Sequence, residues 1–247
     1  SGDIAIVGYT SSTIFPVSIG AFQTTLNPGT VGVNLPQDAF VAKFDATGVL
    51  VWGTYYGGNK YQDYGNGVAI DGAGNVVFTG TTLSSTFPVS GGAFQPIINP
   101  VPVEDAFIVK FDAAGIRQWA TFYGGGNIDE ANAIAIDGND NIAITGRTMA
   151  GDFPISSGAF QSTFGCCSDA FIVKMNPAGA RIWATYFGGT NGADVALDIA
   201  IDTGDNIVIT GLTTSTTFPV TAGCYQPANG GAYDIFLGKF NAAGNRL

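Results

Sequence analysis

The residues of this chain that could do chemistry are carboxylates, because histidine is absent from its 247 residues. Without histidine, the commonest general base and the commonest metal ligand are both missing, so no pair of nucleophile and base can be assembled. Paired carboxylates could still cleave glycosidic bonds. However, the acids recur at equivalent positions along the chain, as structural turns do, whereas a catalytic site normally breaks such symmetry. The sequence therefore predicts a protein that is not an enzyme, with a carbohydrate-active enzyme as the alternative.

One set of these acids follows a Gly-Gly pair in each copy of a recurring segment. Its members are Asp63, Asp129 and Asp194. Equivalent loops of a repeat protein lie on one face, so we expect these carboxylates to form ligand-binding positions. A glycan or a cation is the kind of ligand that they could hold. Solubility is the favoured interpretation of the remaining acids, which are scattered through turns.

A second candidate site is the segment Asp137-Gly-Asn-Asp-Asn141, in which the oxygen donors of Asp137, Asn139 and Asn141 alternate as calcium prefers. The rest of a calcium-binding loop is missing, and Asp, Asn and Gly favour tight turns on their own. A plain turn is therefore the favoured interpretation and calcium is the alternative. No cofactor is required.

A longer pattern, Asp-Ala-Phe-Ile-Val-Lys-Phe and its variants, organises the whole chain. Its copies begin, 64 to 67 residues apart, at Asp38, Asp105, Asp169 and Asp234. Self-similarity at a fixed period indicates a repeat architecture. We therefore treat residues 1–247 as a single repeat domain, in which 1–37 is the end of a preceding repeat. The four aspartates are predicted to be structural and to cap the start of a strand.

Each repeat is predicted to contain four short strands. In the second copy, residues 105–112 alternate with a period of two, which marks a strand, and a glycine turn leads to a second strand at 116–123. That strand carries aromatic residues on both sides, so we expect it to be buried on both faces. Its tryptophan recurs as Trp52, Trp119 and Trp183. Strands at 133–136 and 142–146 and one long connection complete the unit.

This arrangement predicts an all-β fold, a β-propeller of about four blades with four antiparallel strands each. One blade is expected to be incomplete or shared between the termini. The alternative is a β-solenoid, which usually has a much shorter repeat. Two aromatic residues recur in each long connection, for example Phe153 and Phe160, and we expect them to cover strand edges.

Four motifs recur in order along nearly the whole chain: Asp-Ala-Phe-Ile-Val-Lys-Phe, Trp-Ala-Thr-Tyr-Phe-Gly-Gly, Asn-Ile-Val-Ile-Thr-Gly and Gly-Ala-Phe-Gln. In this series the chain resembles the bacterial β-propeller repeat family known as SBBP. The resemblance implies a propeller fold in secreted or surface-anchored proteins, and hence an extracellular or cell-surface location. The family has no agreed catalytic residues, so none is carried over.

The net charge is −10, from 19 acidic and 9 basic residues. Nucleic acids and anionic membrane surfaces are bound through clusters of Lys and Arg, and the sequence has no such cluster, so we expect neither partner. No apolar run approaches the roughly 20 residues that a membrane span needs, so we expect no membrane insertion. The expected partners are neighbouring repeats or further copies of the protein, with a glycan as the alternative.

Three cysteines are present, the adjacent Cys166 and Cys167 and the distant Cys224. In an alignment of the repeats Cys224 takes the position of Ala159, so one member of the adjacent pair could reach it. A disulfide there would suit an oxidising compartment. A bond within the adjacent pair would be strained, and buried free thiols are the other interpretation.

The chain starts in a fourth strand and stops inside a second one, so we expect an incomplete blade with an exposed edge that is a template for strand addition. The predicted function is a non-catalytic extracellular module, structural or binding, in adhesion, surface display or assembly. Two alternatives stay open. One is a protomer of a surface fibre or filament, joined by strand complementation at the incomplete blade, and the other is a carbohydrate-binding propeller lectin.

Overall fold

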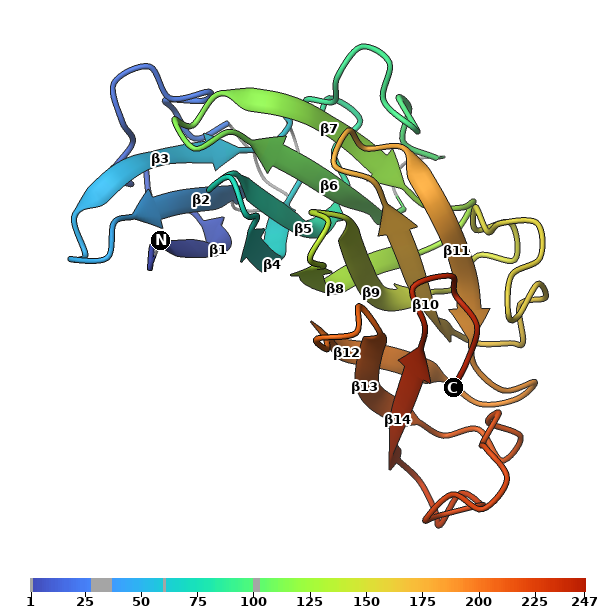
Figure 1. The fold of residues 1–247 in the computed structure, drawn as a ribbon. Helices are drawn as coiled ribbons and strands as arrows, with labels where there is room; N and C mark the ends of the chain where they lie inside the picture. The colour runs from blue at the N-terminus through green and yellow to red at the C-terminus, as the bar shows by residue number, and fades with distance from the viewer. Residues whose placement is uncertain (1, 28–36, 60, 100–102) are drawn as a thin grey trace. The chain divides into compact units, whose positions relative to one another are not determined.

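A computed structural model describes residues 2–27, 37–59, 61–99 and 103–247. Within these ranges the chain forms 14 β-strands and no helix (Figure 1). The strands form four sheets, and neighbouring strands in each sheet are antiparallel. The all-β class is therefore confirmed, with the blade-like sheets of a propeller.

The first of two compact units, Ser1–Tyr123, contains two sheets. The three-stranded sheet has the order β1 (Ile4–Thr10), β2 (Asp38–Phe44) and β3 (Leu50–Tyr56). The four-stranded sheet has the order β4 (Asp63–Ile70), β5 (Val76–Thr82), β6 (Asp105–Phe111) and β7 (Arg117–Tyr123). One apolar cluster joins the two sheets, and it includes Trp52 and Tyr56 from the first and Phe78 and Phe111 from the second.

The second unit, Gly124–Leu247, contains the other two sheets. The four-stranded sheet has the order β8 (Asp129–Ile136), β9 (Ile142–Thr148), β10 (Asp169–Met175) and β11 (Arg181–Phe187). The three-stranded sheet has the order β12 (Asp194–Ile201), β13 (Ile207–Thr213) and β14 (Asp234–Phe240). Their shared apolar cluster includes Ile172 and Phe187 from one sheet and Phe236 and Phe240 from the other.

A sheet does not coincide with one copy of the sequence repeat. In the sheet β8–β11, the strands β10 and β11 belong to the copy that begins at Asp169, while β8 and β9 belong to the copy before it. The long connection 149–168 returns the chain to the edge of β9, where Asp169 lies opposite Thr148. The Gly-Gly turn after β11 instead leads the chain into the next sheet. Sequence copies and sheets are therefore half a repeat out of phase.

The turn that follows each Asp-Ala-Phe strand is closed by a side chain. Between β6 and β7, Oδ1 of Asp112 accepts hydrogen bonds from the backbone N–H groups of Ala114 at 3.0 Å and Ile116 at 2.9 Å. Gly115 has a φ of +85°, a left-handed conformation that glycine adopts without steric cost. The recurring Ala-Ala-Gly pattern is therefore the signature of one turn geometry.

Burial on both faces is found in the central strands and in only part of the tryptophan strands. Every residue of β6 and β10 is buried, although successive side chains point to opposite faces. In β11, residues 183–187 are buried, but Arg181 is half-buried and Ile182 is exposed. The prediction of full burial is wrong for this first half, because β11 is an edge strand of its sheet and Arg181 follows directly on the exposed hairpin turn.

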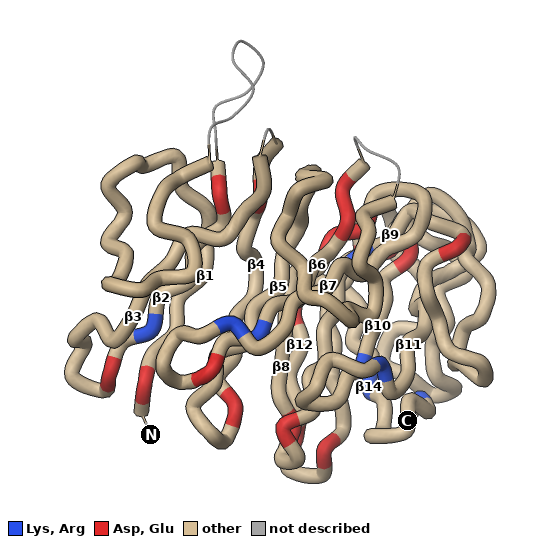
Figure 2. The backbone as a smooth tube through the Cα atoms, turned by 90° about the horizontal axis from the view of Figure 1, so that it is seen from above, with Lys and Arg blue, Asp and Glu red and all other residues tan. Residues whose placement is uncertain are grey.

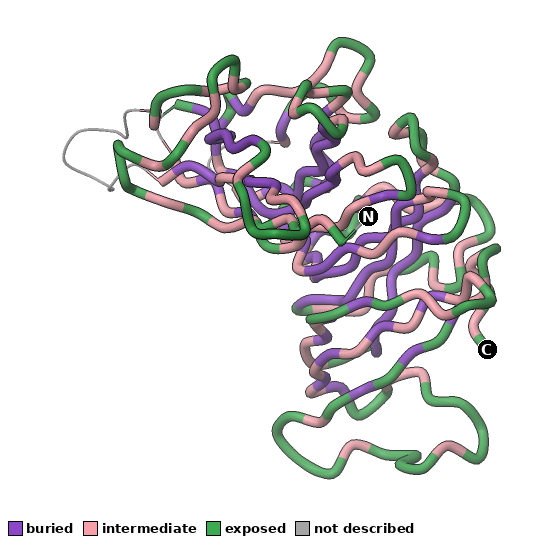
Figure 3. The backbone as a smooth tube through the Cα atoms, turned by 60° about the vertical axis from the view of Figure 1, so that its left-hand side comes forward, coloured by how far each residue is buried: buried purple, intermediate pink, exposed green. Residues whose placement is uncertain are grey.

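The first aromatic residue of each long connection covers a sheet, as expected. Phe153 is 2% exposed, and its ring centroid lies 4.7 Å from that of Phe171 in β10. Phe160, the second aromatic residue, lies against Phe187 and is 37% exposed. The rest of these connections is largely exposed, whereas the strands are buried (Figure 3).

Replacing Phe153 by alanine should lower the free energy of unfolding of the second unit by about 3 to 5 kcal/mol, because a fully enclosed ring leaves a cavity. Phe160→Ala is the matched control, and its cost should be clearly smaller because the ring is partly solvated already. Urea unfolding followed by tryptophan fluorescence measures both. Equal losses in the two variants would contradict the covering role of Phe153.

Candidate functional site

The structure places both sets of recurring aspartates at the first residue of a strand, and Figure 2 shows that acidic residues gather at strand ends. The expected ligand positions are the first residues of β4, β8 and β12, and their side chains have no exposed surface: Asp63, Asp129 and Asp194. Those that start the pattern itself are also buried in three of four copies: Asp38, Asp105 and Asp169. Asp234, the fourth, is half-buried. The ligand candidates therefore do not face solvent as the sequence suggested.

Two of these aspartates from successive sheets meet across the first glycine of a Gly-Gly turn. An ideal Cβ on Gly188 would lie 2.7 Å from Oδ1 of Asp169 and 2.7 Å from Oδ2 of Asp194. In the first unit, a Cβ on Gly57 would lie 2.6 Å from a carboxylate oxygen of Asp38 and from one of Asp63. Only glycine leaves room for both carboxyl groups at this turn.

Backbone amides and one glutamine hold the pair in the second unit. Oδ2 of Asp169 accepts hydrogen bonds from Nε2 of Gln161 at 2.8 Å and from the N–H of Gly165 at 2.9 Å. Oδ2 of Asp194 accepts one from the N–H of Gly189 at 2.8 Å. Within the described part of the chain, no donor reaches Oδ1 of Asp169, whereas the carboxyl of Asp194 also interacts with the hydroxyl of Thr213. A buried oxygen without a donor is costly unless it is protonated or meets a proton on its neighbour.

Burial sets the protonation of these pairs. It raises the pKa of Asp169 to about 7, to which the charge of Asp194 contributes, and it also raises the pKa of Asp194. Burial likewise raises the pKa of Asp38 to about 6 and that of Asp63 well above its ordinary value, where the charge of Asp38 adds to the effect. A buried carboxyl with a second carboxyl nearby retains its proton to higher pH than an exposed one. The fully buried pair serves to join two sheets, and it is not placed to reach a glycosidic bond.

The other recurring acids lie in the tight turns and pair with the lysine of the Asp-Ala-Phe strand. The Nζ–Oδ2 distance is 2.8 Å in each of three sheets, for Lys110 with Asp71, Lys174 with Asp137 and Lys239 with Asp202. In the first sheet the partner of Lys43 is Asp3, at 3.1 Å. The lysine therefore neutralises an acid within its own sheet in every copy.

The pairing of Lys174 with Asp137 bears on the segment 137–141, the candidate calcium site. Oδ1 of Asp137 accepts the N–H groups of Asn139 and Asn141, each at 2.9 Å, and Oδ2 accepts Nζ of Lys174 and Nδ2 of Asn141. Burial alone would raise the pKa of Asp137, but the hydrogen bonds from Lys174 and Asn141 hold it below its usual range. The cation beside this carboxylate is an ammonium group, and the geometry is that of the plain turn. No group of three or more His, Cys, Asp or Glu side chains suited to a metal occurs among the described residues; calcium binding stays a prediction.

The three tryptophans were expected to be structural, and two of them reach the next sheet of their own unit. Nε1 of Trp52 donates a hydrogen bond to the carbonyl of Ala113 at 3.1 Å, and Nε1 of Trp183 donates one to that of Ala242 at 3.0 Å. A Cβ on Gly115 would lie 2.8 Å from the ring of Trp52. The turn glycine is therefore required both by its own backbone and by the indole packed on it. Trp119 is half-buried in β7.

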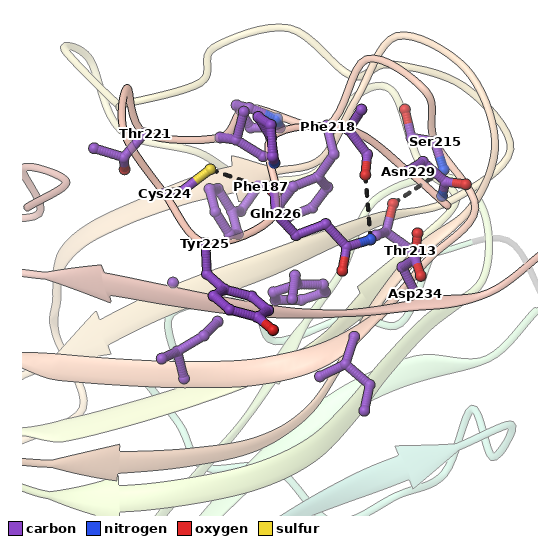
Figure 4. A pocket seen from close by; sticks show the side chains of 18 of the residues that line it. Phe187, Thr213, Ser215, Phe218, Thr221, Cys224, Tyr225, Gln226, Asn229 and Asp234 are labelled. Atoms are coloured by element: carbon purple, nitrogen blue, oxygen red, sulfur yellow. Dashed lines mark hydrogen bonds between the residues drawn. The ribbon is translucent and has the colours of Figure 1, made fainter. Parts of the chain in front are cut away.

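A hollow of about 440 Å³ lies along β14 in the second unit (Figure 4). Tyr225, Gln226, Phe218 and Thr213 are among the side chains that line it. The free edge of β14 forms one wall, since β13 is its only neighbour among the described strands. The aromatic, amide and hydroxyl groups around the hollow make it the open site that the aspartates do not provide.

In the other three sheets, an outer strand fills the place that corresponds to this hollow. β3, β7 and β11 pair with β2, β6 and β10, the equivalents of β14. The ring that corresponds to Tyr225 then packs on an aromatic residue of that strand, as Phe22 does on Tyr56 with centroids 5.0 Å apart. Tyr225 itself is fully exposed. Sequence analysis predicted an exposed strand edge at the incomplete blade but not the hollow or the residues that line it, although the recurring loop aromatic was a signal that could have located them.

Burial of the Asp169 and Asp194 pair predicts that stability falls as the pH rises. The raised pKa means that the folded chain keeps a proton that the unfolded chain releases above pH about 4, so the free energy of unfolding should fall between pH 5 and 8. Asp169→Asn should reduce this fall by on the order of 1 to 2 kcal/mol after allowance for solvent screening, because the amide replaces the protonated carboxyl. Urea titrations at both pH values measure it. Asp234→Asn, at the half-buried fourth copy, is the control, and an unchanged pH dependence in Asp169→Asn would contradict the raised pKa of Asp169.

Removing the ammonium group from the Lys174 pair should be strongly destabilising. Lys174→Met leaves Asp137 buried without its counter-ion and should lower the free energy of unfolding by about 3 to 5 kcal/mol. Lys239→Met removes the equivalent lysine, whose side chain is 44% exposed, and should cost under about 1 kcal/mol. Denaturant unfolding at pH 7 compares the two variants. Similar losses would show that burial does not govern these pairs.

Comparison with known proteins adds a repeat family to this geometry. Residues 51–88 match the family model described as SBBP, beta-propeller repeat. The matched segment runs from β3 through β4 and β5 into the following connection, and so contains the Gly57 turn and Asp63. The match supports the family that the motifs resemble.

A relative is the "Uncharacterized WD repeat-containing protein L264" of Acanthamoeba polyphaga mimivirus, which is 29% identical over 203 residues. The alignment covers 72% of this chain and 14% of the relative, so the chain spans a small part of that protein. This relative is viral, and a bacterial source for the chain is not shown. Both descriptions name repeat proteins, which suggests a repeat-based binding or scaffold module. Within the described ranges, the fold contains no helix long and apolar enough to span a membrane.

Proposed function

We propose that this chain is a non-catalytic scaffold module that joins further β-strands at the edge of β14, in an extracellular or cell-surface protein. The location is supported by the resemblance to secreted and surface-anchored repeat proteins. The observation that carries the proposal is that the loop beside β14 repeats the groups that bind an outer strand in the other sheets, whether that strand belongs to the same protein or to a partner. Adhesion, surface display and assembly into a filament all use such a module.

The other sheets specify what the incoming strand must offer. In the sheet β8–β11, the N–H of Gln161 donates to Oγ1 of Thr185 at 2.9 Å, its carbonyl accepts the N–H of Tyr186 at 3.3 Å, and its Oε1 accepts the N–H of Gly188 at 2.8 Å. Gln226 stands at the corresponding position of the last sheet. The matching strand therefore has threonine, then an aromatic residue, and glycine two positions further on.

The start of such a strand is already aligned beside β14. Arg246 forms an antiparallel bridge with Phe240, as Arg181 does with Met175 in the preceding sheet. Its guanidinium donates to the carbonyl of Pro219 at 2.6 Å and lies 4.9 Å from the centroid of Phe160. The strand that fits beside β14 is thus one of the Trp-Ala-Thr-aromatic-aromatic-Gly pattern that continues this alignment.

The apolar side chains of β14 lie on the sheet face that packs against a following sheet in β2 and β10, so a further sheet, and not the edge strand itself, would cover them. Ile235 is 80% exposed and Leu237 is 75% exposed. Their equivalents in β10, Ala170 and Ile172, have no exposed surface. Burying apolar surface of this kind under a further sheet contributes roughly 25 cal/mol for each square ångström removed from water, separately from the backbone hydrogen bonds of strand addition.

A fluorescent peptide with the sequence Trp-Ala-Thr-Tyr-Phe-Gly-Gly should bind the protein, and a scrambled peptide should not. Gln226→Ala should weaken binding about tenfold or more. The substitution removes the hydrogen bond that the side-chain oxygen would accept from the strand, and it releases the backbone of residue 226, which would make two more. Gln118→Ala, an exposed glutamine of β7, is the control and should bind as the unchanged protein does. Fluorescence anisotropy measures the affinity.

Absence of peptide binding at concentrations up to about 1 mM would overturn strand addition at β14. The carbohydrate alternative has its own outcome in a glycan array. A sugar that binds the unchanged protein, and whose binding is lost in Tyr225→Ala, would assign the hollow to a glycan instead.

A further inference from the structure

The adjacent cysteines lie together in the connection between β9 and β10, away from β14. The Sγ atoms of Cys166 and Cys167 are 2.6 Å apart. Both residues are free thiols in the structure, as is Cys224, whose Sγ contacts the carbonyl of Gln226 at 3.2 Å. The sulfur atoms that meet are therefore those of the adjacent pair, and the cross-repeat disulfide with Cys224 is not formed.

The backbone brings the two thiols to the same side. In an extended chain, successive side chains point to opposite faces, which would separate neighbouring sulfur atoms. Cys167 has a φ of 63°, a left-handed conformation that is uncommon for a residue with a side chain. This conformation reverses the alternation at one residue. Strain of this kind persists only where the surrounding structure holds it.

Both flanks of the pair are anchored. The N–H of Gly165 donates to Oδ2 of Asp169 at 2.9 Å, and the carbonyl of Ser168 accepts the N–H of Asp194 at 2.8 Å. Ser168 also forms a parallel bridge with Ala193, next to the first strand of the following sheet. The pair is therefore presented by a segment that is fixed at both ends, and Cys167 is exposed to solvent.

We propose that Cys166 and Cys167 form a reversible redox site, which closes into a disulfide between adjacent residues when a small-molecule disulfide such as oxidised glutathione is present. The thiolate of Cys167 attacks that disulfide and releases one small thiol. The thiolate of Cys166 then attacks Sγ of Cys167 and releases the second. One protein S–S bond replaces two S–H bonds, and the two electrons and two protons reduce the oxidant to two thiols.

The oxidation state of this site changes a contact between the connection from β9 to β10 and the connection from β11 to β12. Sγ of Cys166 donates a weak hydrogen bond to the carbonyl of Gly192 at 3.7 Å, and Gly192 lies in the connection from β11 to β12. The disulfide has no S–H group, so this contact is lost on oxidation. The same segment holds Asp169 of the buried carboxyl pair, which places the redox site where the two sheets of the second unit are joined.

The test equilibrates the folded protein with mixtures of reduced and oxidised glutathione, followed by alkylation and peptide mass spectrometry. We expect the loss of two of the three alkylatable thiols, with a disulfide inside the peptide that holds both adjacent cysteines and with Cys224 still alkylated. Cys166→Ser and Cys167→Ser should each retain a glutathione that no second thiol displaces. A synthetic peptide of residues 163–170 should require a more oxidising mixture, because it lacks the anchored conformation.

Three results would overturn the proposal. The first is three alkylatable thiols after full equilibration, and the second is a disulfide that includes Cys224. The third is a peptide that closes as readily as the folded protein, which would show that the fold contributes nothing to the site. Circular dichroism of each variant confirms that the readout comes from folded protein, and Cys224→Ser should close its adjacent pair as the unchanged chain does.

Discussion

Negative charge buried at the ends of strands is the constraint on which this structure depends. An isolated carboxylate cannot be buried without compensation, and the chain compensates it in two ways. In the tight turns a lysine from the neighbouring strand supplies the opposite charge, as Lys174 does for Asp137. At the passage from one sheet to the next, Asp169 and Asp194 meet across Gly188 with raised pKa values and backbone donors. The first way fixes strands within a sheet, and the second joins two sheets.

The two ways respond oppositely to acid. The lysine pairs are fully formed when the carboxyl groups are ionised, so their contribution declines as the pH falls through the lowered pKa of Asp137. The buried carboxyl groups at the sheet junctions are favoured in the protonated form, so their contribution declines as the pH rises. A module held by both kinds of interaction should therefore be most stable at mildly acidic pH.

Local pattern was enough to predict the strands, because period-two alternation and glycine turns are properties of neighbouring residues. It also identified the loop aromatic Phe153 as a cover. The pairing of Asp169 with Asp194 could not be predicted, since it arises only where the chain leaves one sheet for another. The same limit hid the half-repeat shift between sheets and sequence copies. The left-handed backbone at Cys167 was equally hidden, because nothing in the pair's composition requires it.

The open site shows a different limit. Exposure of Ile235 and Leu237 depends on whether another sheet packs on that face of β14, whereas the alternation of apolar residues in β14 is the same as in a covered strand. Only comparison with the equivalent strands β2, β6 and β10 shows that β14 lacks neighbours that those strands have. Repetition within a single chain thus supplies the internal reference that an isolated domain lacks.

The contact between Trp183 and the turn that contains Gly244 has a genetic consequence. The indoles of Trp52 and Trp183 both pack on a turn glycine that recurs in the sequence, so a duplication or deletion of one whole repeat would leave both tryptophans with an equivalent glycine to pack on. A change of any other length places the indole against the wrong turn. The coding sequence could therefore grow or shrink by recombination in steps of one repeat while this contact between the sheets of a unit is preserved.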